Sequence, residues 1–382
     1  MQWIQRETCT ACGACDNACP VQAIEMTEDQ CGFRYPIIDE EKCIQCGRCK
    51  KVCPILKEIE QAHDFQKRVY AAWSKDGKTR FNSTSGGAFS EIARTVIAAG
   101  GAVAGAAYGS RFEVEHIVVW DEEGLLRLRQ SKYVQSMSKN IFEQVERTLL
   151  CDAMVLFCGT PCQIAGLKSY LGKDYHNLLT VDFICRGVNS PKAYRAWLQE
   201  IELKNQKKVK TVWFKYKENG WKKSPKCTRI DFHDGSWKVY TDKKNSFMTG
   251  YLGPNLYIRP SCAQCKFKGS ERQADITLAD FWGIEKEYDD DNGTSLVIVN
   301  SEKGQKWFDK ASVRMIVHEK KLEDIYAGNS CFNHSVTVSE KSRVFLMSLN
   351  QSNFSRQIRK YTHIPFGRRV LNKLKRCLSK TR

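Results

Sequence analysis

Beyond residue 68, the chain alternates short apolar runs with longer segments in which apolar residues recur every three or four positions. The apolar runs predict strands, and they span 69–74, 102–108, 114–121, 153–158 and 178–185. Helical periodicity lies between them, at 83–101, 138–150, 159–171 and 190–203, and Pro161 suits the first turn of the third helix. Strands that alternate with helices predict an α/β body with parallel strands, in which ligands bind at the carboxyl ends of the strands.

The later part of the chain is richer in strand patterns. Residues 209–217, 227–235 and 236–240 favour a β-rich stretch, and residues 295–300 are typical of a buried strand. We expect helices at 304–311 and 320–327, whereas the acidic residues 289–293 lack the spacing of a calcium-binding loop and predict a turn. The body is therefore expected to be mixed α/β with some α+β character.

An internal repeat precedes this body: CTACGACDNACP at 9–20 returns as CIQCGRCKKVCP at 43–54. Both copies have the spacing C-x2-C-x2-C-x3-C-P. Three thiolates at this spacing wrap one face of a 4Fe–4S cubane, and the fourth, which a proline follows, ligates the partner cluster. We therefore expect cluster one to be held by Cys9, Cys12, Cys15 and Cys53. Cluster two is then expected on Cys43, Cys46, Cys49 and Cys19.

Zinc is the alternative metal for paired C-x2-C motifs. Zinc sites rarely need a third cysteine at the same step or a proline after the fourth. The spacing favours iron and sulfur, and it predicts a small bacterial-type two-cluster ferredoxin domain over residues 1–60. A polar, helix-compatible linker at 55–67 connects this domain to the body.

A second group of cysteines lies in the body, at the carboxyl ends of predicted strands and in a later C-x2-C pair. Cys162 and Cys185 follow two of the strands, and Cys262 and Cys265 form the pair. Four thiolates from three turns are enough for a third cubane. The alternative is that they are buried apolar residues, as many free cysteines are. Cys158 is a spare, either a substitute ligand or a core residue.

Length and composition narrow the class of protein. A chain of 382 residues is long enough for two or three domains. The opening residues MQWIQRETC show no pattern of a secretory signal, and no apolar run reaches the length of a membrane span. Eight of the 18 cysteines have cluster spacing, which favours a reducing compartment over a disulfide framework. We therefore expect a cytoplasmic protein.

The net charge of +17 is concentrated at the C-terminus. Residues 356–382 contain ten Lys and Arg and no Asp or Glu, and apolar residues recur among them at helical spacing. We treat 346–382 as a basic amphipathic tail that either contacts the inner face of a membrane, contacts a partner protein, or is a solvated terminal helix. No recognition motif accompanies the charge, so nucleic acid is not an expected partner.

Several motifs resemble the coenzyme F420 hydrogenase/dehydrogenase beta-subunit family. They are GTPCQ at 159–163, ICRGVNSP at 184–191, RPSCAQCKF at 259–267 and ADITLADFWG at 274–283. The resemblance covers about 69–283 and includes the fused ferredoxin domain of many members. It implies a flavoenzyme with FAD beside a 4Fe–4S cluster, and it carries the ligand role to Cys162, Cys185, Cys262 and Cys265. Arg186 departs from the family, where many members have His.

The resemblance also implies that STSGG at 83–87 and SKYVQS at 131–136 lie around the flavin. Independently, a cubane passes one electron at a time and a hydride acceptor takes two, so a cofactor such as a flavin is needed between them. The FAD pyrophosphate needs backbone N–H donors, which Ser85, Gly86 and Gly87 can offer at a helix start. Lys132 can stabilise the anionic reduced flavin, although a lone lysine is more often a solvated charge. Tyr133 and Thr160 complete the expected FAD-binding residues.

The sequence therefore predicts an oxidoreductase whose body spans 61–345. Electrons pass between the clusters and an FAD that exchanges a hydride with an organic substrate, either F420-like or a glycan precursor. The expected partner is a redox protein, such as a ferredoxin or a partner oxidoreductase. Two alternatives remain: a non-catalytic electron-transfer subunit that docks on a partner enzyme, and a redox-active thiol pair of Cys158 and Cys162.

Overall fold

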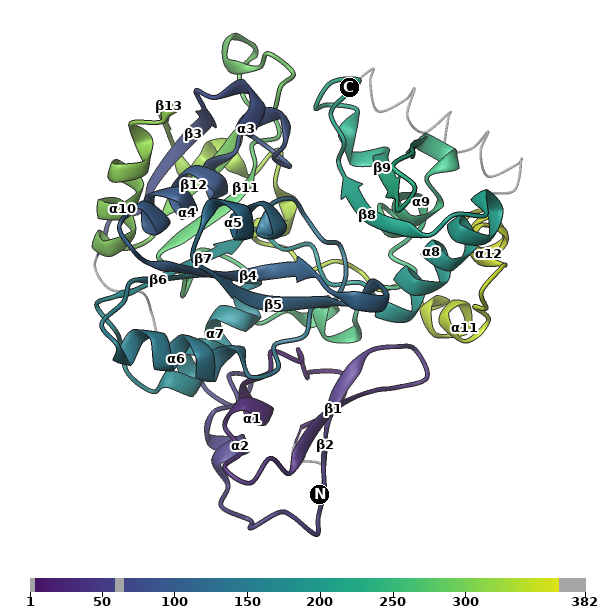
Figure 1. The fold of residues 1–382 in the computed structure, drawn as a ribbon, viewed down its shortest axis with the longest axis horizontal. Helices are drawn as coiled ribbons and strands as arrows, with labels where there is room; N and C mark the ends of the chain where they lie inside the picture. Colours follow the sequence, from purple (N-terminus) through teal and green to yellow (C-terminus); the bar gives the residue numbers. More distant parts are fainter. Residues whose placement is uncertain (1–3, 59–64, 364–382) are drawn as a thin grey trace, which may run out of the picture.

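The structure is a computed structural model that describes residues 4–58 and 65–363. It has a small cluster domain, a body built on a large sheet, and a second, smaller sheet beside that body (Figure 1). In the view of Figure 1 the cluster domain lies below the large sheet and the small sheet lies to its right.

The cluster domain contains a hairpin and two short helices. Strands β1 (Ile24–Glu28) and β2 (Arg34–Ile38) pair antiparallel. Helices α1 (Ala14–Asn17) and α2 (Arg48–Lys51) occupy equivalent places in the two copies of the cysteine repeat. Each begins after a glycine with positive φ, at Gly13 (90°) and Gly47 (70°), which is a backbone conformation that glycine adopts without strain.

The large sheet has eight strands in the order β13-β3-β12-β11-β7-β6-β4-β5. Their bounds are β3 Arg68–Ser74, β4 Ala102–Tyr108, β5 Val114–Val119, β6 Val155–Cys158, β7 Leu178–Phe183, β11 Ile276–Asp280, β12 Ser295–Val299 and β13 Met315–Lys320. The central strands β4, β6, β7 and β11 are parallel, and the outer pairs are antiparallel. The predicted α/β class is confirmed, with the difference that the sheet is mixed.

Helices cover both faces of the large sheet. On one face, α4 (Ala88–Ala98), α5 (Glu122–Leu128) and α10 (Glu302–Ser312) bury apolar residues against the strands. On the other face, α6 (Ile141–Leu150) and α7 (Pro161–Leu171) do the same, and α1 packs against both of them. Helix α3 (Gly77–Phe81) contacts β3 and begins after Asp76, whose carboxylate accepts from Lys78 N and Thr79 N.

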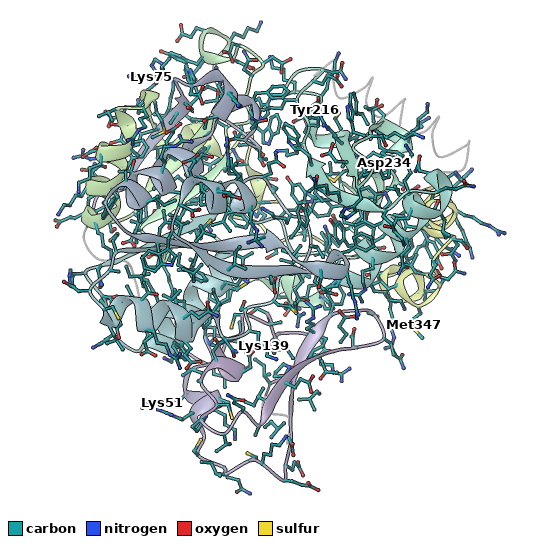
Figure 2. The ribbon with its side chains drawn as sticks, in the orientation of Figure 1. Lys51, Lys75, Lys139, Tyr216, Asp234 and Met347 are labelled. Atoms are coloured by element: carbon teal, nitrogen blue, oxygen red, sulfur yellow. The ribbon has the colours of Figure 1, made fainter. Side chains whose placement is uncertain are left out.

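The cluster domain is docked on α6 and α7 by polar contacts as well as by packing. Asn17 Nδ2 donates to Ser138 O at 2.8 Å, and Phe142 N donates to Asn17 Oδ1 at 3.1 Å. Lys139 lies at this junction (Figure 2). A single amide thus pairs with the backbone at the start of α6, so the position of α1 against the body is specified.

The small sheet is antiparallel, in the order β10-β9-β8, with β8 Val209–Phe214, β9 Cys227–Phe232 and β10 Trp237–Thr241. Helices α8 (Pro191–Asn205), α9 (Ser246–Tyr251), α11 (Ser342–Met347) and α12 (Phe354–Thr362) pack around it. Aromatic rings fill the interior, where Trp197, Phe214 and Phe247 lie with centroids 4.9–5.8 Å apart. Tyr216 lies where this unit meets the large-sheet body (Figure 2).

The C-terminal part of the chain differs from the expected pattern in two ways. Phe354 and Ile358 of α12 are buried in the aromatic core. The packed body therefore extends into the range 346–382, which the sequence analysis treated as a tail. Residues 320–327 contain a 3-10 turn at Leu322–Ile325 in place of the expected helix. The basic residues of 364–382 lie outside the described residues. No helix among those that are described has the length and apolar character to cross a membrane.

Candidate functional site

A cavity of about 500 Å³ lies between the carboxyl ends of the central strands and the small sheet. Its wall includes Cys158 at the end of β6, Ile184 after β7 and Asp280 at the end of β11. Residues 83–90 and 128–136 of the body and Lys215 after β8 complete much of the wall. The volume lies within the range of small-molecule and cofactor sites, and the location follows the rule for parallel strands.

The four body cysteines converge beside this cavity. Cys162 occupies the first turn of α7, Cys185 follows β7, and Cys262 lies in the 3-10 segment Pro260–Gln264 that precedes Cys265. The pKa of the Cys185 thiol is raised to about 12, mainly by burial and in part by the neighbouring Cys262 and Cys265. Burial also raises the pKa of Cys162, again with contributions from Cys265 and Cys185. Four thiols from three loops are therefore mutual neighbours.

This thiol set is too widely spaced for a single metal ion. Among the described residues, no three His, Cys, Asp or Glu side chains are close enough to hold one ion. A cubane has a different requirement, because each thiolate binds a separate iron atom. Cys162 and Cys185 in the cavity wall, with Cys262 and Cys265 next to Cys185, fit that larger group. The positive φ of Gly187 (138°) also serves the convergence, because a Cβ there would lie 2.8 Å from Ile258 and 3.2 Å from the Cβ of Cys262.

The N-terminal cysteines also separate into two groups. A small pocket is lined by the four residues expected for cluster one, namely Cys9, Cys12, Cys15 and Cys53. The pKa of Cys12 is raised to about 12, mainly by burial and in part by the neighbouring Cys9 and Cys53. Cys53 thus lies beside three cysteines of the first copy of the repeat.

The second copy of the repeat is more exposed. Burial raises the pKa of the Cys49 thiol, and its neighbours Cys46 and Cys43 add to the shift. Cys19 Sγ accepts a hydrogen bond from Ala23 N at 3.2 Å. Cys46 is exposed, so this end of the domain faces the surroundings.

Helix α7 connects the two buried thiol groups. A Cβ on Gly166 would lie 2.9 Å from the Sγ of Cys12, so only glycine lets the cluster domain approach the helix this closely. One turn earlier on the same helix is Cys162, and Cys12 is among the neighbours that raise the pKa of Cys162. The first cluster site and the body cysteines are therefore adjacent.

Cys158 does not join either group. Its carbonyl contacts His116 Nε2 at 3.2 Å, and burial raises the pKa of its thiol to about 12. The charged neighbours that influence this thiol are Asp182 and Lys132. Cys158 is thus placed as a residue of the cavity wall at the end of β6.

Of the three loop residues expected to bind FAD, two line the cavity and one packs against the sheet. Ser85 and Gly87 line the cavity, and Gly87 (φ 96°) is the residue before α4, so the N-terminus of this 11-residue helix faces the cavity. Gly86 points away from it: a Cβ there would lie 2.4 Å from Ala72 O, and its N–H donates to Ser295 Oγ at 3.0 Å. Gly86 therefore packs the loop onto β3 and β12.

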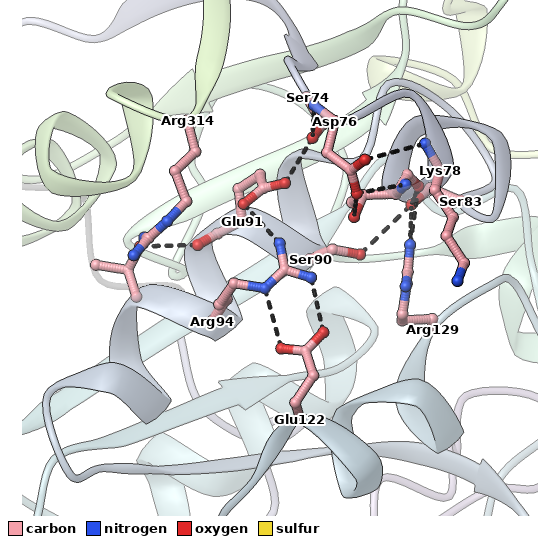
Figure 3. Close-up of polar contacts among 12 residues, drawn as sticks. Ser74, Asp76, Lys78, Ser83, Ser90, Glu91, Arg94, Glu122, Arg129 and Arg314 are labelled. Atoms are coloured by element: carbon pink, nitrogen blue, oxygen red, sulfur yellow. Dashed lines mark hydrogen bonds and ion pairs between the residues drawn. The ribbon is translucent and has the colours of Figure 1, made fainter.

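A polar network holds this loop from behind (Figure 3). Arg129 Nη2 donates to Thr79 O at 2.8 Å and to Ser83 Oγ at 3.4 Å. Glu91 of α4 accepts from Ser74 Oγ at 2.6 Å and pairs with Arg94 at 2.8 Å. These contacts fix the start of α4 before any ligand binds. The N–H of Ala88 donates to Ser295 Oγ at 3.4 Å, which leaves the next N–H groups of the first turn for a ligand.

Lys132, Tyr133 and Thr160 also line the cavity. The Lys132 ammonium donates to Arg129 O at 2.7 Å and Arg127 O at 3.0 Å, and burial lowers its pKa to about 7. Thr160 caps α7 through reciprocal hydrogen bonds with Gln163. Thr160 thus has a structural task, and the Lys132 amine is directed at the carbonyls of its own segment.

Three polar residues that lie at the cavity and at the cluster-domain junction were not identified from the sequence. Lys215 and Asp280 form a buried ion pair in the cavity wall. Arg259 is fully buried between the cluster domain and the body; its Nε donates to Cys9 O at 2.8 Å, and its guanidinium lies 4.3 Å from the ring centroid of Tyr35. Asp280 and Arg259 lie within the quoted motifs, but nothing in one sequence distinguishes them from surface charges.

Comparisons with known protein families agree with this geometry. Residues 152–325 match the model that describes the C terminus of the coenzyme F420 hydrogenase/dehydrogenase beta subunit. Two 4Fe–4S dicluster domain models match residues 8–55 and 35–85. No curated protein matches the chain. A chain of the xenon-derivatised F420-reducing NiFe hydrogenase complex from Methanosarcina barkeri aligns at 16% identity and a TM-score of 0.46, over 79% of this chain and 92% of that one.

The dicluster domain and the buried thiols define the protein as an iron–sulfur electron-transfer protein. Residues 152–325 match the model of the coenzyme F420 hydrogenase/dehydrogenase beta subunit, which confirms the resemblance drawn from the motifs. This match supports an oxidoreductase as the general class of activity.

Proposed function

We propose that this protein is an iron–sulfur flavoprotein oxidoreductase. Electrons pass between the ferredoxin-type clusters and an FAD that exchanges a hydride with an organic substrate. One observation carries the proposal: Cys162 and Cys185 form part of the same cavity wall as the N-terminus of α4. Thiolates for a one-electron centre and backbone donors for a phosphate-bearing cofactor therefore meet at one cavity.

The proposed cluster ligands follow from the thiol groups described above. The third cluster is assigned to the body cysteines and cluster one to the pocket of Cys9, Cys12, Cys15 and Cys53. Cluster two is assigned to Cys43, Cys46, Cys49 and Cys19. The exposure of Cys46 makes cluster two the entry for electrons from a redox partner. The contact of Cys12 with Gly166 makes cluster one the link to the third cluster.

The residues proposed to bind FAD are Ser85 and Gly87 at the pyrophosphate and Lys132 and Tyr133 beside the ring system, with Gly86 and Thr160 shaping the loops. When bound, FAD supplies the exchange between one-electron and two-electron transfer. The N-terminus of α4 at the cavity would orient the phosphates. The free thiols of the described residues support a reducing, cytoplasmic compartment. The substrate is F420-like or a glycan precursor.

The experiment is the cofactor content of anaerobically purified protein. We expect about 12 iron atoms per chain and FAD in about one-to-one ratio. Cys262→Ala is expected to lose about four irons and to prevent reduction of the flavin by the N-terminal clusters. Cys151→Ala is a matched control, because Cys151 is exposed and belongs to none of the proposed ligand sets. Clusters without any flavin would instead favour a non-catalytic electron-transfer subunit, and full iron content in Cys262→Ala would exclude the third cluster.

A further inference from the structure

The cavity wall that faces the small sheet contains a buried ion pair with no part in binding the clusters or the FAD phosphates. Lys215 follows β8, and its ammonium contacts Asp280 Oδ2 at the end of β11. Their side chains are 5% and 17% exposed. The second oxygen, Asp280 Oδ1, is also buried and has no hydrogen-bond partner among the described residues.

Stability does not explain this arrangement. A buried ion pair gains little over apolar residues of the same volume, and a buried oxygen without a donor costs free energy. Lys215 also has φ 56°, a left-handed conformation that is costly for a residue with a side chain. Both residues border the cavity, so a bound molecule can contact them.

Tyr133 adds a second donor to the pair. Burial raises the pKa of its hydroxyl, although Lys215 lowers it, so the hydroxyl keeps its proton. Burial lowers the pKa of Lys215, but Asp280 and Tyr133 raise it more, so the amine is a cation near neutral pH. The wall therefore presents two donors, Lys215 Nζ and Tyr133 Oη, beside one free acceptor, Asp280 Oδ1.

This polar group lies next to the body cysteines. Strands β7 and β11 are parallel, with Phe183 level with Leu278; Asp280 ends β11 two residues later, and Cys185 lies two residues beyond Phe183, where β7 has ended. Neighbouring strands are about 4.8 Å apart. Cys185 is also among the groups that raise the pKa of Tyr133. A molecule bound by the donors is thus close to the proposed third cluster.

We propose that Lys215, Tyr133 and Asp280 bind the oxygen of a carbonyl group that this protein reduces to an alcohol. This inference rests on the proposed function. A carbonyl oxygen has lone pairs only, which suits two donors. After reduction the oxygen bears a hydrogen, which the free Asp280 Oδ1 accepts. The same three atoms therefore fit both members of a carbonyl–alcohol couple, and the reverse reaction uses the same contacts.

The step balances in atoms and electrons. The carbonyl carbon gains a hydride, which is one proton with two electrons, from the reduced flavin of the proposed function. The π bond of the carbonyl breaks, and its electron pair moves to the oxygen. The oxygen takes a proton from the Lys215 ammonium, which gives the alcohol. The neutral Lys215 amine then regains a proton from solvent.

The test uses the holoprotein, reduced anaerobically with dithionite and mixed with an oxidant in a stopped-flow instrument. The oxidants are dihydroxyacetone as the carbonyl probe, 5-deazariboflavin as a conjugated-ring hydride acceptor, and ferricyanide as a one-electron acceptor. Wild-type protein is expected to form glycerol from dihydroxyacetone as its flavin absorbance returns. In Lys215→Met this rate is expected to fall about 100-fold or more, with the ferricyanide rate unchanged. Lys210→Met, at an exposed position of β8, is the matched control.

Asp280→Asn keeps the shape of its side chain and tests the site if Lys215→Met does not fold; it is expected to slow the carbonyl reaction and to leave the ferricyanide rate unchanged. Unchanged carbonyl rates in the variants would overturn the proposal. So would a wild-type protein that reduces 5-deazariboflavin but forms no glycerol. Failure of the proposed function differs from both, because the purified protein would then contain no FAD for dithionite to bleach.

Discussion

The buried guanidinium of Arg259 leads to a prediction about the reduction potentials of the clusters. Arg259 is 0% exposed, and no ion pair to a carboxylate is found for it among the described residues. Its contacts are Cys9 O at 2.8 Å, Gln135 Oε1 at 3.2 Å and the ring of Tyr35, and its Nη2 atom has no hydrogen-bond partner there. A buried charge normally needs a counterion, because its desolvation is costly.

The proposed clusters supply that missing negative charge. Cys9 is assigned to cluster one, and Cys262 of the third cluster donates its N–H to Arg259 O at 3.0 Å. A cubane bound by four thiolates is anionic, and it becomes more negative on reduction. Arg259 therefore favours the reduced state of the clusters on either side of it.

The size of the effect follows from Coulomb's law. For a charge roughly 7 Å from the added electron and an effective dielectric constant of about 20, the interaction is about 2.4 kcal/mol. For a one-electron couple this corresponds to about 100 mV, since a tenfold change is about 59 mV. Arg259→Gln is thus expected to shift the nearby midpoint potentials negative by about this amount.

The assay is a potentiometric titration followed by electron paramagnetic resonance. Arg6→Gln is the matched control, because Arg6 also lies over the Tyr35 ring, at 5.3 Å, but is exposed and screened by solvent. Arg259→Lys keeps the positive charge, so its midpoint potentials are expected to lie between those of the wild type and of Arg259→Gln. Unchanged potentials in an Arg259→Gln protein with full iron content would refute this reasoning.

Three further predictions concern packing and pH. Gly166→Val is expected to push Cys12 away from α7 and to remove about four irons, because even a Cβ would lie 2.9 Å from the Cys12 sulfur; iron analysis that finds no loss would contradict the proposed contact. Gly86→Ala places a Cβ 2.4 Å from Ala72 O, so denaturant unfolding is expected to show a loss of about 1–3 kcal/mol together with weaker FAD retention. Burial lowers the pKa of His116 from 6.5 to about 4, so the unfolded chain takes up the proton first as pH falls; stability is expected to decrease by up to about 3 kcal/mol between pH 6.5 and 4. His116→Phe should flatten that part of the stability profile, and an unchanged pH dependence would argue against a buried neutral His116.

Local sequence patterns predict most of the helices and strands. They also predict the cysteine ligand sets, but not the buried polar residues Lys215, Asp280 and Arg259. Apolar runs such as the one that forms β3 keep their meaning in any fold, because their side chains must be buried somewhere. Strand β11 is not among the predicted strands, because ITLAD at Ile276–Asp280 is short and lies inside a longer motif. The antiparallel direction of the outer strands is not predicted either, since strand direction depends on which neighbour each strand finds.

The sequence by itself predicted the N-terminal cluster domain, because each copy of C-x2-C-x2-C-x3-C-P supplies three ligands of one cluster and the fourth ligand of the other, all within the first 54 residues. It also located Cys162 and Cys185 after the ends of two strands. Only the tertiary structure showed that Cys12 reaches α7 at Gly166, that Arg259 is buried between two thiol groups, and that Lys215 meets Asp280 from another sheet. Those contacts join residues 65 to 250 positions apart. Their energies depend on burial and distance, which a linear sequence does not contain.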